Sequence, residues 1–364
     1  MTYSDSAELH ISLSALQENY RTMARHAQTA QTAAVVKADG YGLGMAEIAR
    51  ALTEAGCTQF FVAQTDEALA LRALLPDAVI YVLNGLPQNA AADFAHHDFR
   101  PCLTSLAQVQ EWQAHCQAHD AKPACLFIDT GFNRLGFGEL ELIDLAASPA
   151  LFDGWELALI ASHLACADTP DHPMNAAQLE RFRHALDQLP DAPASLANSG
   201  GVMLGAAYHF DLVRVGIMLY GGAATARDED ALAPVATLRA PLLQIRDLSI
   251  GDAVGYGAAF TASHDMKIGI LSLGYGDGLG RHFGNLSSAK ARFMMNGHSV
   301  PLVGRISMDS LAVDLTDCPL APNVGDLVEI FGPNNLIDNV ATQGNTIAYE
   351  LLTSLGKRYN RIYS

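Results

Sequence analysis

Positive charge is scarce in this sequence of 364 residues, which has five lysines. Lysines and arginines together number 22 against 39 aspartates and glutamates, so the formal net charge is −17. Nucleic-acid binding needs a basic face, and the composition therefore argues against a nucleic-acid partner. A small acidic or zwitterionic substrate stays compatible, because a single pocket can be locally positive.

Long apolar runs and paired cysteines are also missing. No run approaches the roughly 18 apolar residues that span a bilayer, and the first twenty residues lack the apolar centre of a signal peptide. We therefore expect no membrane partner. The six cysteines form no CxxC pair, so we interpret them as small buried hydrophobes and expect neither disulfides nor a metal site. These features predict a reducing, cytoplasmic location.

An apolar content of 50% is enough for a large core, and the length predicts two domains. In the first two-thirds, short β-type runs alternate with helical patterns, which indicates parallel strands. The predicted strands are 33–38, 59–64, 78–83, 99–104, 124–129, 155–162, 194–198 and 210–215. The predicted helices are 46–55, 66–74, 106–119, 140–146 and 176–189. Eight such strands favour a closed (β/α)8 barrel, with an open doubly wound sheet as the alternative.

The pattern changes at residues 221–234, which are rich in glycine and alanine, then acidic, and then contain proline. This composition is typical of a linker. Short apolar runs divided by glycines follow, and they predict a mostly antiparallel β domain that ends in a helix over 345–357. We therefore predict a barrel domain at 1–230 and a C-terminal β domain at 231–364.

Polar residues gather where the predicted barrel strands end, which is where (β/α)8 enzymes place their active sites. They are Lys37, Asn84, Asp129, Arg134, His163, Asn198, Ser199 and Arg214. A lone histidine or arginine at such a position is more often structural. Several on one rim indicate a site.

Lys37 is the sharpest signal, because among the five lysines it alone ends a predicted buried strand. Burial of an ammonium group is costly, and it lowers the lysine pKa and frees the amine for imine chemistry. The alternative is a side chain that extends to solvent at the rim. Ser199–Gly201 and Gly216–Ile217 follow the last two barrel strands, where backbone N–H groups commonly bind phosphate. A reactive lysine facing a phosphate site suggests pyridoxal 5'-phosphate.

Nine motifs extend this interpretation over residues 35–358. In chain order they are VVKADGYGLG, IDTGFNRLGF, SHLACAD, LANSGG, VRVGIMLYG, VGYGAAF, LGYGDG, GRISMD and YELLTSLGKR. The set resembles the bacterial alanine racemases. The resemblance implies a pyridoxal-phosphate-dependent isomerase that interconverts L- and D-alanine and so supplies D-alanine for peptidoglycan. It also implies a head-to-tail homodimer with shared active sites.

The resemblance implies a role for each matching residue. Lys37 would form an imine with the cofactor, and Tyr256 of the partner subunit would be the second catalytic base. Arg214 would face the pyridine nitrogen, with His163 beside the ring. The remaining cofactor-binding residues would be Tyr41, Asn198, Ser199, Gly216, Ile217 and Tyr349. The substrate-binding residues would be Arg134, Met308, Asp309 and Tyr275.

The sequence departs from the family pattern in front of Arg134. Many members carry a carbamylated lysine seven residues earlier that orients this arginine, and here that position is Phe127. Either another group orients Arg134 or the arginine is held more loosely. The alternatives to an alanine racemase are a broader racemase of small amino acids and a barrel-fold decarboxylase with the same cofactor, for which Cys318 is the candidate cysteine. The third alternative is a non-catalytic protein that carries the cofactor. Such proteins resemble the barrel alone, so the predicted second domain argues against this alternative.

Overall fold

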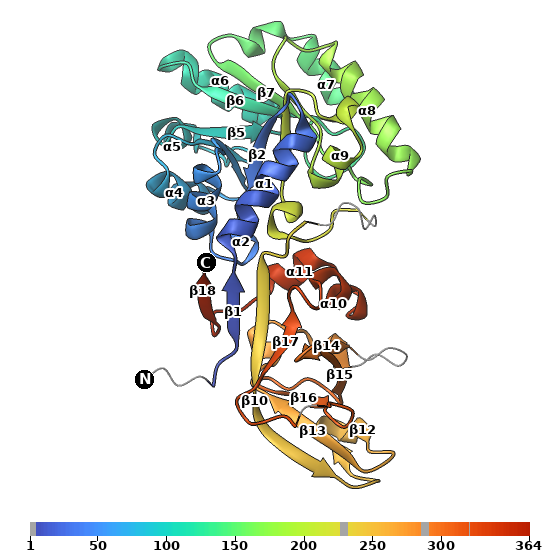
Figure 1. Ribbon diagram of the computed structural model, residues 1–364. Helices are drawn as coiled ribbons and strands as arrows, with labels where there is room; N and C mark the ends of the chain where they lie inside the picture. The colour runs from blue at the N-terminus through green and yellow to red at the C-terminus, as the bar shows by residue number, and fades with distance from the viewer. Residues whose placement is uncertain (1–4, 226–231, 285–290, 320) are drawn as a thin grey trace.

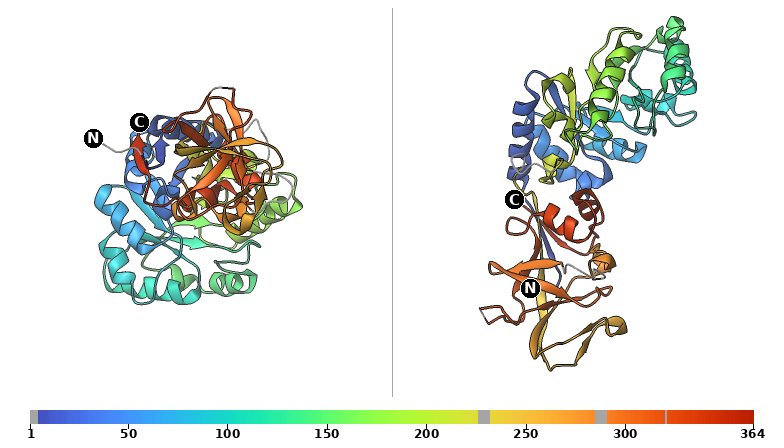
Figure 2. Two further views of the ribbon diagram at one scale, coloured as in Figure 1. Left: turned by 90° about the horizontal axis from the view of Figure 1, so that it is seen from below. Right: turned by 90° about the vertical axis from the view of Figure 1, so that its right-hand side faces the viewer.

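The computed structural model describes residues 5–225, 232–284, 291–319 and 321–364, which form two lobes joined end to end (Figures 1 and 2). One lobe contains eight parallel strands in the order β8-β7-β6-β5-β4-β3-β2-β9. Their bounds are β2 Gln31–Val35, β3 Gln59–Val62, β4 Val79–Val82, β5 Phe99–Leu103, β6 Pro123–Phe127, β7 Glu156–Ala161, β8 Ala194–Ser195 and β9 Leu212–Val215. Each overlaps one of the eight predicted strands, so that prediction is confirmed.

The two outermost strands of this order, β8 and β9, also approach each other. The Asp211 N–H donates to the Ala194 carbonyl at 3.0 Å, and the Arg214 N–H donates to the Ala197 carbonyl at 2.9 Å. Backbone hydrogen bonds thus bring the sheet to a nearly closed barrel. The open doubly wound alternative is excluded.

Helices surround the barrel. They are α3 Met45–Glu54, α4 Thr65–Leu74, α5 Ala91–His96, α6 Leu106–Ala118, α7 Glu139–Ala146, α8 Pro173–Leu186 and α9 Ser199–Met203. The five predicted helices are confirmed. The short helices α5 and α9 were not predicted. Neither was α1, Leu13–Ala27, which precedes the first barrel strand and packs against the 3-10 turn η3, Ile217–Tyr220, which follows the last one. The Asn19 side-chain amide donates to the carbonyls of Leu219 and Ala233, and so fixes α1 in this position.

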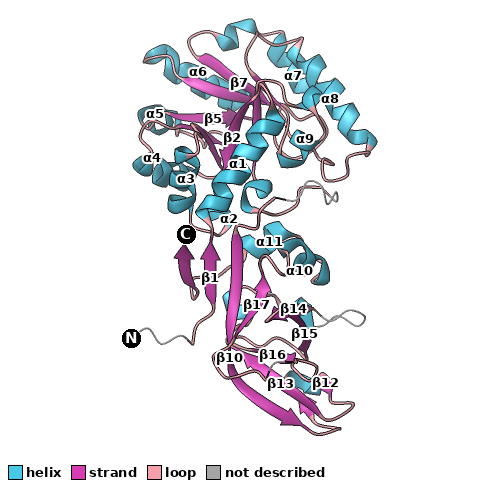
Figure 3. Cartoon of the chain, viewed as in Figure 1, coloured by secondary structure: helices cyan, strands magenta, loops and turns pink. Residues whose placement is uncertain are grey.

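The second lobe is mostly antiparallel sheet, as predicted (Figure 3). Its main strands are β10 Ala236–Leu248, β13 Met266–Leu271, β14 Arg292–Met295, β15 His298–Val303, β16 Leu311–Asp314 and β17 Leu327–Phe331. The long strand β10 pairs with both β17 and β13, and this pairing closes the sheet into a ring. A separate hairpin joins β11, Ala253–Val254, to β12, Phe260–Thr261.

The chain's first described strand, β1 (Glu8–Ile11), belongs to the sheet of the second lobe. It pairs antiparallel with β10 and parallel with the last strand, β18 (Asn360–Tyr363). The sequence pattern did not reveal this crossing. The boundary predicted between residues 230 and 231 lies outside the described residues.

The short helix α2, Lys37–Tyr41, lies at the junction of the lobes, next to α11, Ala348–Thr353, which follows α10, Ile337–Gln343 (Figure 1). The Arg361 guanidinium donates to the Gly42 carbonyl at 2.7 Å, and the Tyr363 hydroxyl donates to the Leu43 carbonyl at 2.9 Å. The end of the chain therefore supports the turn that follows the first barrel strand. Within the described ranges, no helix is long and apolar enough to cross a membrane.

Candidate active site

The turn after β2 is strained. Ala38, Asp39 and Gly40 have positive φ angles of 53°, 56° and 61°, so the segment labelled α2 is a left-handed turn. Each non-glycine residue in this conformation costs about 1–2 kcal/mol. Side chains offset the cost: the Asp39 carboxylate accepts the Met45 N–H at 2.9 Å, and the Glu67 carboxylate accepts the Ala38 N–H at 2.6 Å. The sharp turn gives Lys37 and Tyr41 access to one cavity.

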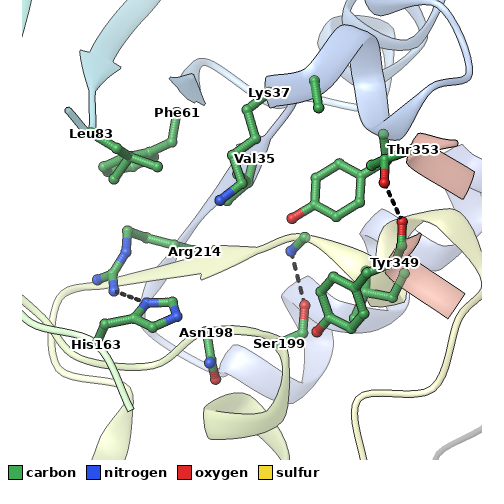
Figure 4. Close-up of a pocket in the computed structure, with 14 residues that line it drawn as sticks. Val35, Lys37, Phe61, Leu83, His163, Asn198, Ser199, Arg214, Tyr349 and Thr353 are labelled. Carbon is green, nitrogen blue, oxygen red and sulfur yellow. Dashed lines mark hydrogen bonds between the residues drawn. The ribbon is translucent and has the colours of Figure 1, made fainter. Parts of the chain in front are cut away.

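This cavity, of about 190 Å³, opens at the carboxyl ends of the barrel strands. Its lining residues are Val35, Lys37, Ala38, Tyr41, Phe61, Leu83, His163, Asn198, Ser199, Arg214, Gly216, Ile217, Tyr349 and Thr353. All nine residues predicted to bind the cofactor are among them. In Figure 4, Lys37 enters the cavity from the side opposite Ser199. Arg214 and His163 lie together at one end of the cavity, and Tyr349 lies at the other end.

The Lys37 amine is poised as a nucleophile and base. Burial lowers its pKa, and the positive charge of Arg134 lowers it further. The Glu67 carboxylate opposes this with a smaller effect than that of Arg134, and Arg214 adds the weakest lowering. Among the described residues, the amine has no carboxylate partner within ion-pair distance. The neutral amine is therefore more available than in an exposed lysine.

Arg214 is buried and held by four acceptors. Its guanidinium donates to the Ser195 carbonyl at 2.9 Å, to the Ser195 hydroxyl at 2.5 Å, to the Ser162 carbonyl, and to the His163 Nδ1 at 3.4 Å. Burial lowers the Arg214 pKa to about 10, which leaves the group charged at neutral pH. Burial and the nearby charges of Arg214 and Arg134 lower the pKa of His163, so its imidazole is neutral and can accept from Arg214.

The opposite end of the cavity offers hydroxyl groups. The Ser199 hydroxyl oxygen accepts the Gly216 N–H at 2.9 Å, which leaves the Ser199 O–H free to donate. Burial raises the pKa of Tyr349 to about 12 and also raises that of Tyr41, so both phenols stay protonated and can donate. A Cβ atom at Gly216 would stand only 2.4 Å from the Tyr41 hydroxyl oxygen, so a larger residue would close this space.

These features fit pyridoxal 5'-phosphate. An amine with a lowered pKa stands beside the cavity, a fixed guanidinium lies at one end, and hydroxyl donors suited to a phosphate lie at the other. Sequence reasoning assigned no role to five of the lining residues, which are Val35, Ala38, Phe61, Leu83 and Thr353. Phe61 is an apolar strand residue without a distinguishing motif, and Thr353, whose hydroxyl donates to the Tyr349 carbonyl at 2.7 Å, lies on α11 of the other lobe.

Tyr256 does not line the cavity of its own chain. It begins the 3-10 turn η5, Tyr256–Ala258, next to β12 at the far end of the second lobe, and its side chain is 67% exposed (Figure 1). Tyr275, Met308 and Asp309 are also absent from the cavity lining and lie together elsewhere in this lobe. The Tyr275 N–H donates to the Ser307 carbonyl at 2.9 Å, and Arg358 donates to the Asp309 carboxylate at 2.7 Å.

Arg134 lies beside the cavity lining rather than in it. Its charge acts on both Lys37 and His163, and its guanidinium carbon stands 4.1 Å from the centroid of the Phe132 ring. Phe127 is buried on β6, and its side chain supplies neither charge nor a hydrogen-bonding group.

Comparison with known proteins gives one consistent family. The sequence-family model of the alanine racemase N-terminal domain matches residues 11–224. The family model of the alanine racemase C-terminal domain matches residues 235–363. A catabolic alanine racemase of Agrobacterium fabrum is 45% identical over 98% of this chain and 92% of its own. An alanine racemase of Rhizobium meliloti is 43% identical over 99% of this chain and 97% of its own.

Solved structures agree. The alanine racemase from Bartonella henselae, crystallised with covalently bound pyridoxal phosphate, superposes with a TM-score of 0.95 at 43% identity, over 99% of each chain. The biosynthetic alanine racemase from Pseudomonas aeruginosa has a TM-score of 0.90 at 36% identity, again over 99% of each chain.

Proposed function

Because this chain belongs to the alanine racemase family and is a pyridoxal-phosphate-dependent enzyme that interconverts L- and D-alanine, we propose that Lys37 and Tyr256 are its two catalytic bases. The observation that carries the proposal is the Lys37 amine, which adjoins the cavity with a lowered pKa and no carboxylate partner among the described residues. Neutral lysine is otherwise scarce near pH 7, because its ordinary pKa is 10.5.

The bound cofactor supplies electron withdrawal that makes the Cα hydrogen of alanine acidic. Lys37 would hold the cofactor covalently, and the hydroxyls of Tyr41, Ser199 and Tyr349 would donate to its phosphate, beside Asn198, Gly216 and Ile217. Arg214 would donate a hydrogen bond to the pyridine nitrogen. Because an arginine with a pKa of about 10 keeps its proton at neutral pH, the nitrogen would stay largely unprotonated and the electron withdrawal would be limited, which disfavours side reactions.

Two bases on opposite faces of Cα allow one proton to be removed and another to be delivered without any rotation of the substrate. Lys37 would serve one face and Tyr256 the other, each within hydrogen-bond reach of Cα when substrate is bound. Arg134 would attract the alanine carboxylate. His163, neutral and buried, would hold Arg214 in place rather than exchange protons.

A head-to-tail homodimer follows from this assignment. Tyr256 is exposed and absent from the cavity of its own chain, so a second chain would have to supply it. Met308 is also exposed, at 53%, and would reach the substrate from the partner together with Asp309, while Tyr275 would narrow the entrance. We further propose that the enzyme works in the cytoplasm and supplies D-alanine for peptidoglycan, in line with its six free cysteines.

The barrel-fold decarboxylase gains no support from the site. Cys318 does not line the cavity and packs instead against the apolar core.

The test of the proposal is direct. Purified protein with pyridoxal phosphate and L-alanine should produce racemic alanine by chiral chromatography, whereas carbon dioxide and ethylamine, or unchanged L-alanine, would contradict it. Lys37→Ala should lower kcat by at least about 10⁴-fold, because it removes both the covalent attachment and one base. It should also lose the visible absorbance that stays with the wild-type protein after gel filtration. A Lys37→Ala protein that kept this absorbance would disprove the cofactor assignment.

A further inference from the structure

Arg134 is a cation held without an anion. Its guanidinium makes no hydrogen bond or ion pair with any residue in the described ranges, and its side chain is exposed. The basic groups of Arg134, Arg214 and Lys37 all act on His163, which places them in one neighbourhood where like charges repel. An unrestrained arginine would therefore turn outward into solvent. The contact that opposes this is the stack on Phe132, at 4.1 Å from guanidinium carbon to ring centroid.

Phe132 in turn packs against His163. Its ring stands edge-on to His163, with the two centroids 5.5 Å apart and the planes at 65°. The His163 Nδ1 accepts a hydrogen bond from the Arg214 guanidinium. A continuous chain of contacts therefore runs from Arg214 through His163 and Phe132 to Arg134.

The backbone around Phe132 is equally constrained. The Asp129 carboxylate accepts the N–H groups of Gly131 at 2.8 Å and Asn133 at 3.1 Å, on either side of Phe132. Farther along the loop, the Phe137 N–H donates to the Phe127 carbonyl at 2.9 Å and closes the base of the loop. The backbone on both sides of Phe132 is therefore held by hydrogen bonds.

We propose that Phe132 is a positioning residue, whose ring face holds the Arg134 guanidinium beside the Lys37 amine so that it can receive the substrate carboxylate. An aromatic face attracts a cation without neutralising it. An acidic side chain could also hold the Arg134 guanidinium in place. It would, however, compete with the substrate carboxylate for that guanidinium. Phe132 thus supplies the orientation that Phe127 cannot. This inference rests on the proposed role of Arg134.

The test compares holoenzyme variants at position 132. Phe132→Leu removes the ring face and should raise the KM for L-alanine about 3- to 30-fold, the range that a lost cation–π contact allows, with kcat within about threefold of wild type. The dissociation constant of propionate, a carboxylate without the amine, should rise by a similar factor in isothermal titration calorimetry. Phe132→Tyr keeps the ring face and should restore both values to within about twofold. If the leucine variant does not fold, Phe132→Met also removes the ring face and can be compared with Phe132→Tyr in the same way.

Leu135→Ala is the matched control, because Leu135 is an exposed apolar residue of the same loop and should leave KM and propionate binding unchanged. Unaltered KM and propionate affinity in Phe132→Leu would overturn the inference, as would equal losses in the leucine and tyrosine variants. A wild-type protein that binds the cofactor but does not racemise alanine would instead refute the proposed function, so the two failures are distinguishable.

Discussion

The turns that carry Lys37 and Tyr256 are built alike and placed differently. Each joins a tyrosine to glycines with positive φ, at Gly40 and Gly42 in the first turn and at Gly255 and Gly257 in the second. Tyr41 in the first turn is 6% exposed, whereas Tyr256 in the second is 67% exposed. Similar local sequences thus produce one buried site element and one protruding element.

The surroundings explain the difference. A Cβ atom at Gly42 would stand 2.1 Å from the Leu352 carbonyl oxygen, so the second lobe presses directly on the Lys37 turn. At Gly255 the nearest atom would be 3.8 Å away. The Lys37 turn is therefore clamped within its own chain, whereas the Tyr256 turn protrudes, as the proposed dimer would require.

Tyr256→Phe, in the protruding turn, should have the largest effect. We expect kcat to fall about 10²- to 10⁴-fold, the usual effect of losing a general base, while bound cofactor and Tm stay at wild-type values because the side chain is exposed. Deuterium exchange from solvent should fall far more for one enantiomer of alanine than for the other, as measured by NMR. Small and equal losses for both enantiomers would contradict the two-base scheme.

The second prediction concerns stability. Gly42→Ala should destabilise the protein by about 3 kcal/mol or more, because it adds a clash with fixed backbone to the strain of a positive φ. Gly251→Ala is the control: its φ is +95° but nothing lies within 4 Å, so only the strain of about 1 kcal/mol remains. Urea unfolding of both variants measures the difference. Equal destabilisation would show that the Lys37 turn is not clamped by the second lobe.

The third prediction uses the lowered pKa of Lys37. In the window between that lowered pKa and the ordinary value of 10.5, the unfolded chain binds a proton that the folded chain does not, so folding stability rises with pH. The cofactor-free Lys37→Met variant lacks this group. It should therefore be more stable than wild type below the window, and the advantage should disappear as pH approaches 10.5.

Thermal unfolding of the two proteins across this pH range measures the effect. Lys357→Met, at an exposed lysine, is the control and should show no such pH-dependent difference. An advantage that stayed constant with pH would mean that burial of the Lys37 amine does not set its protonation.

Much of the barrel was predictable, because each strand is a short apolar run and the polar residues cluster where the strands end. Strand β1 was not, because its partners β10 and β18 lie more than 200 residues away and four residues carry no pairing signal. The left-handed backbone at Ala38 and Asp39 also escaped prediction, since alanine does not favour it and the distant Glu67 carboxylate helps to hold it. The stack of Arg134 on Phe132 depends on the shape of a loop that the sequence pattern does not encode.

The central claim is that each active site combines Lys37 of one chain with Tyr256 of another, and mixing two inactive variants tests it most directly. Lys37→Ala and Tyr256→Phe proteins, dissociated and reassembled together at equal concentration, form mixed dimers in which one site has both wild-type residues. Random pairing in a twofold dimer predicts about a quarter of the wild-type racemase activity. A mixture no more active than the two variants measured apart would contradict the shared site.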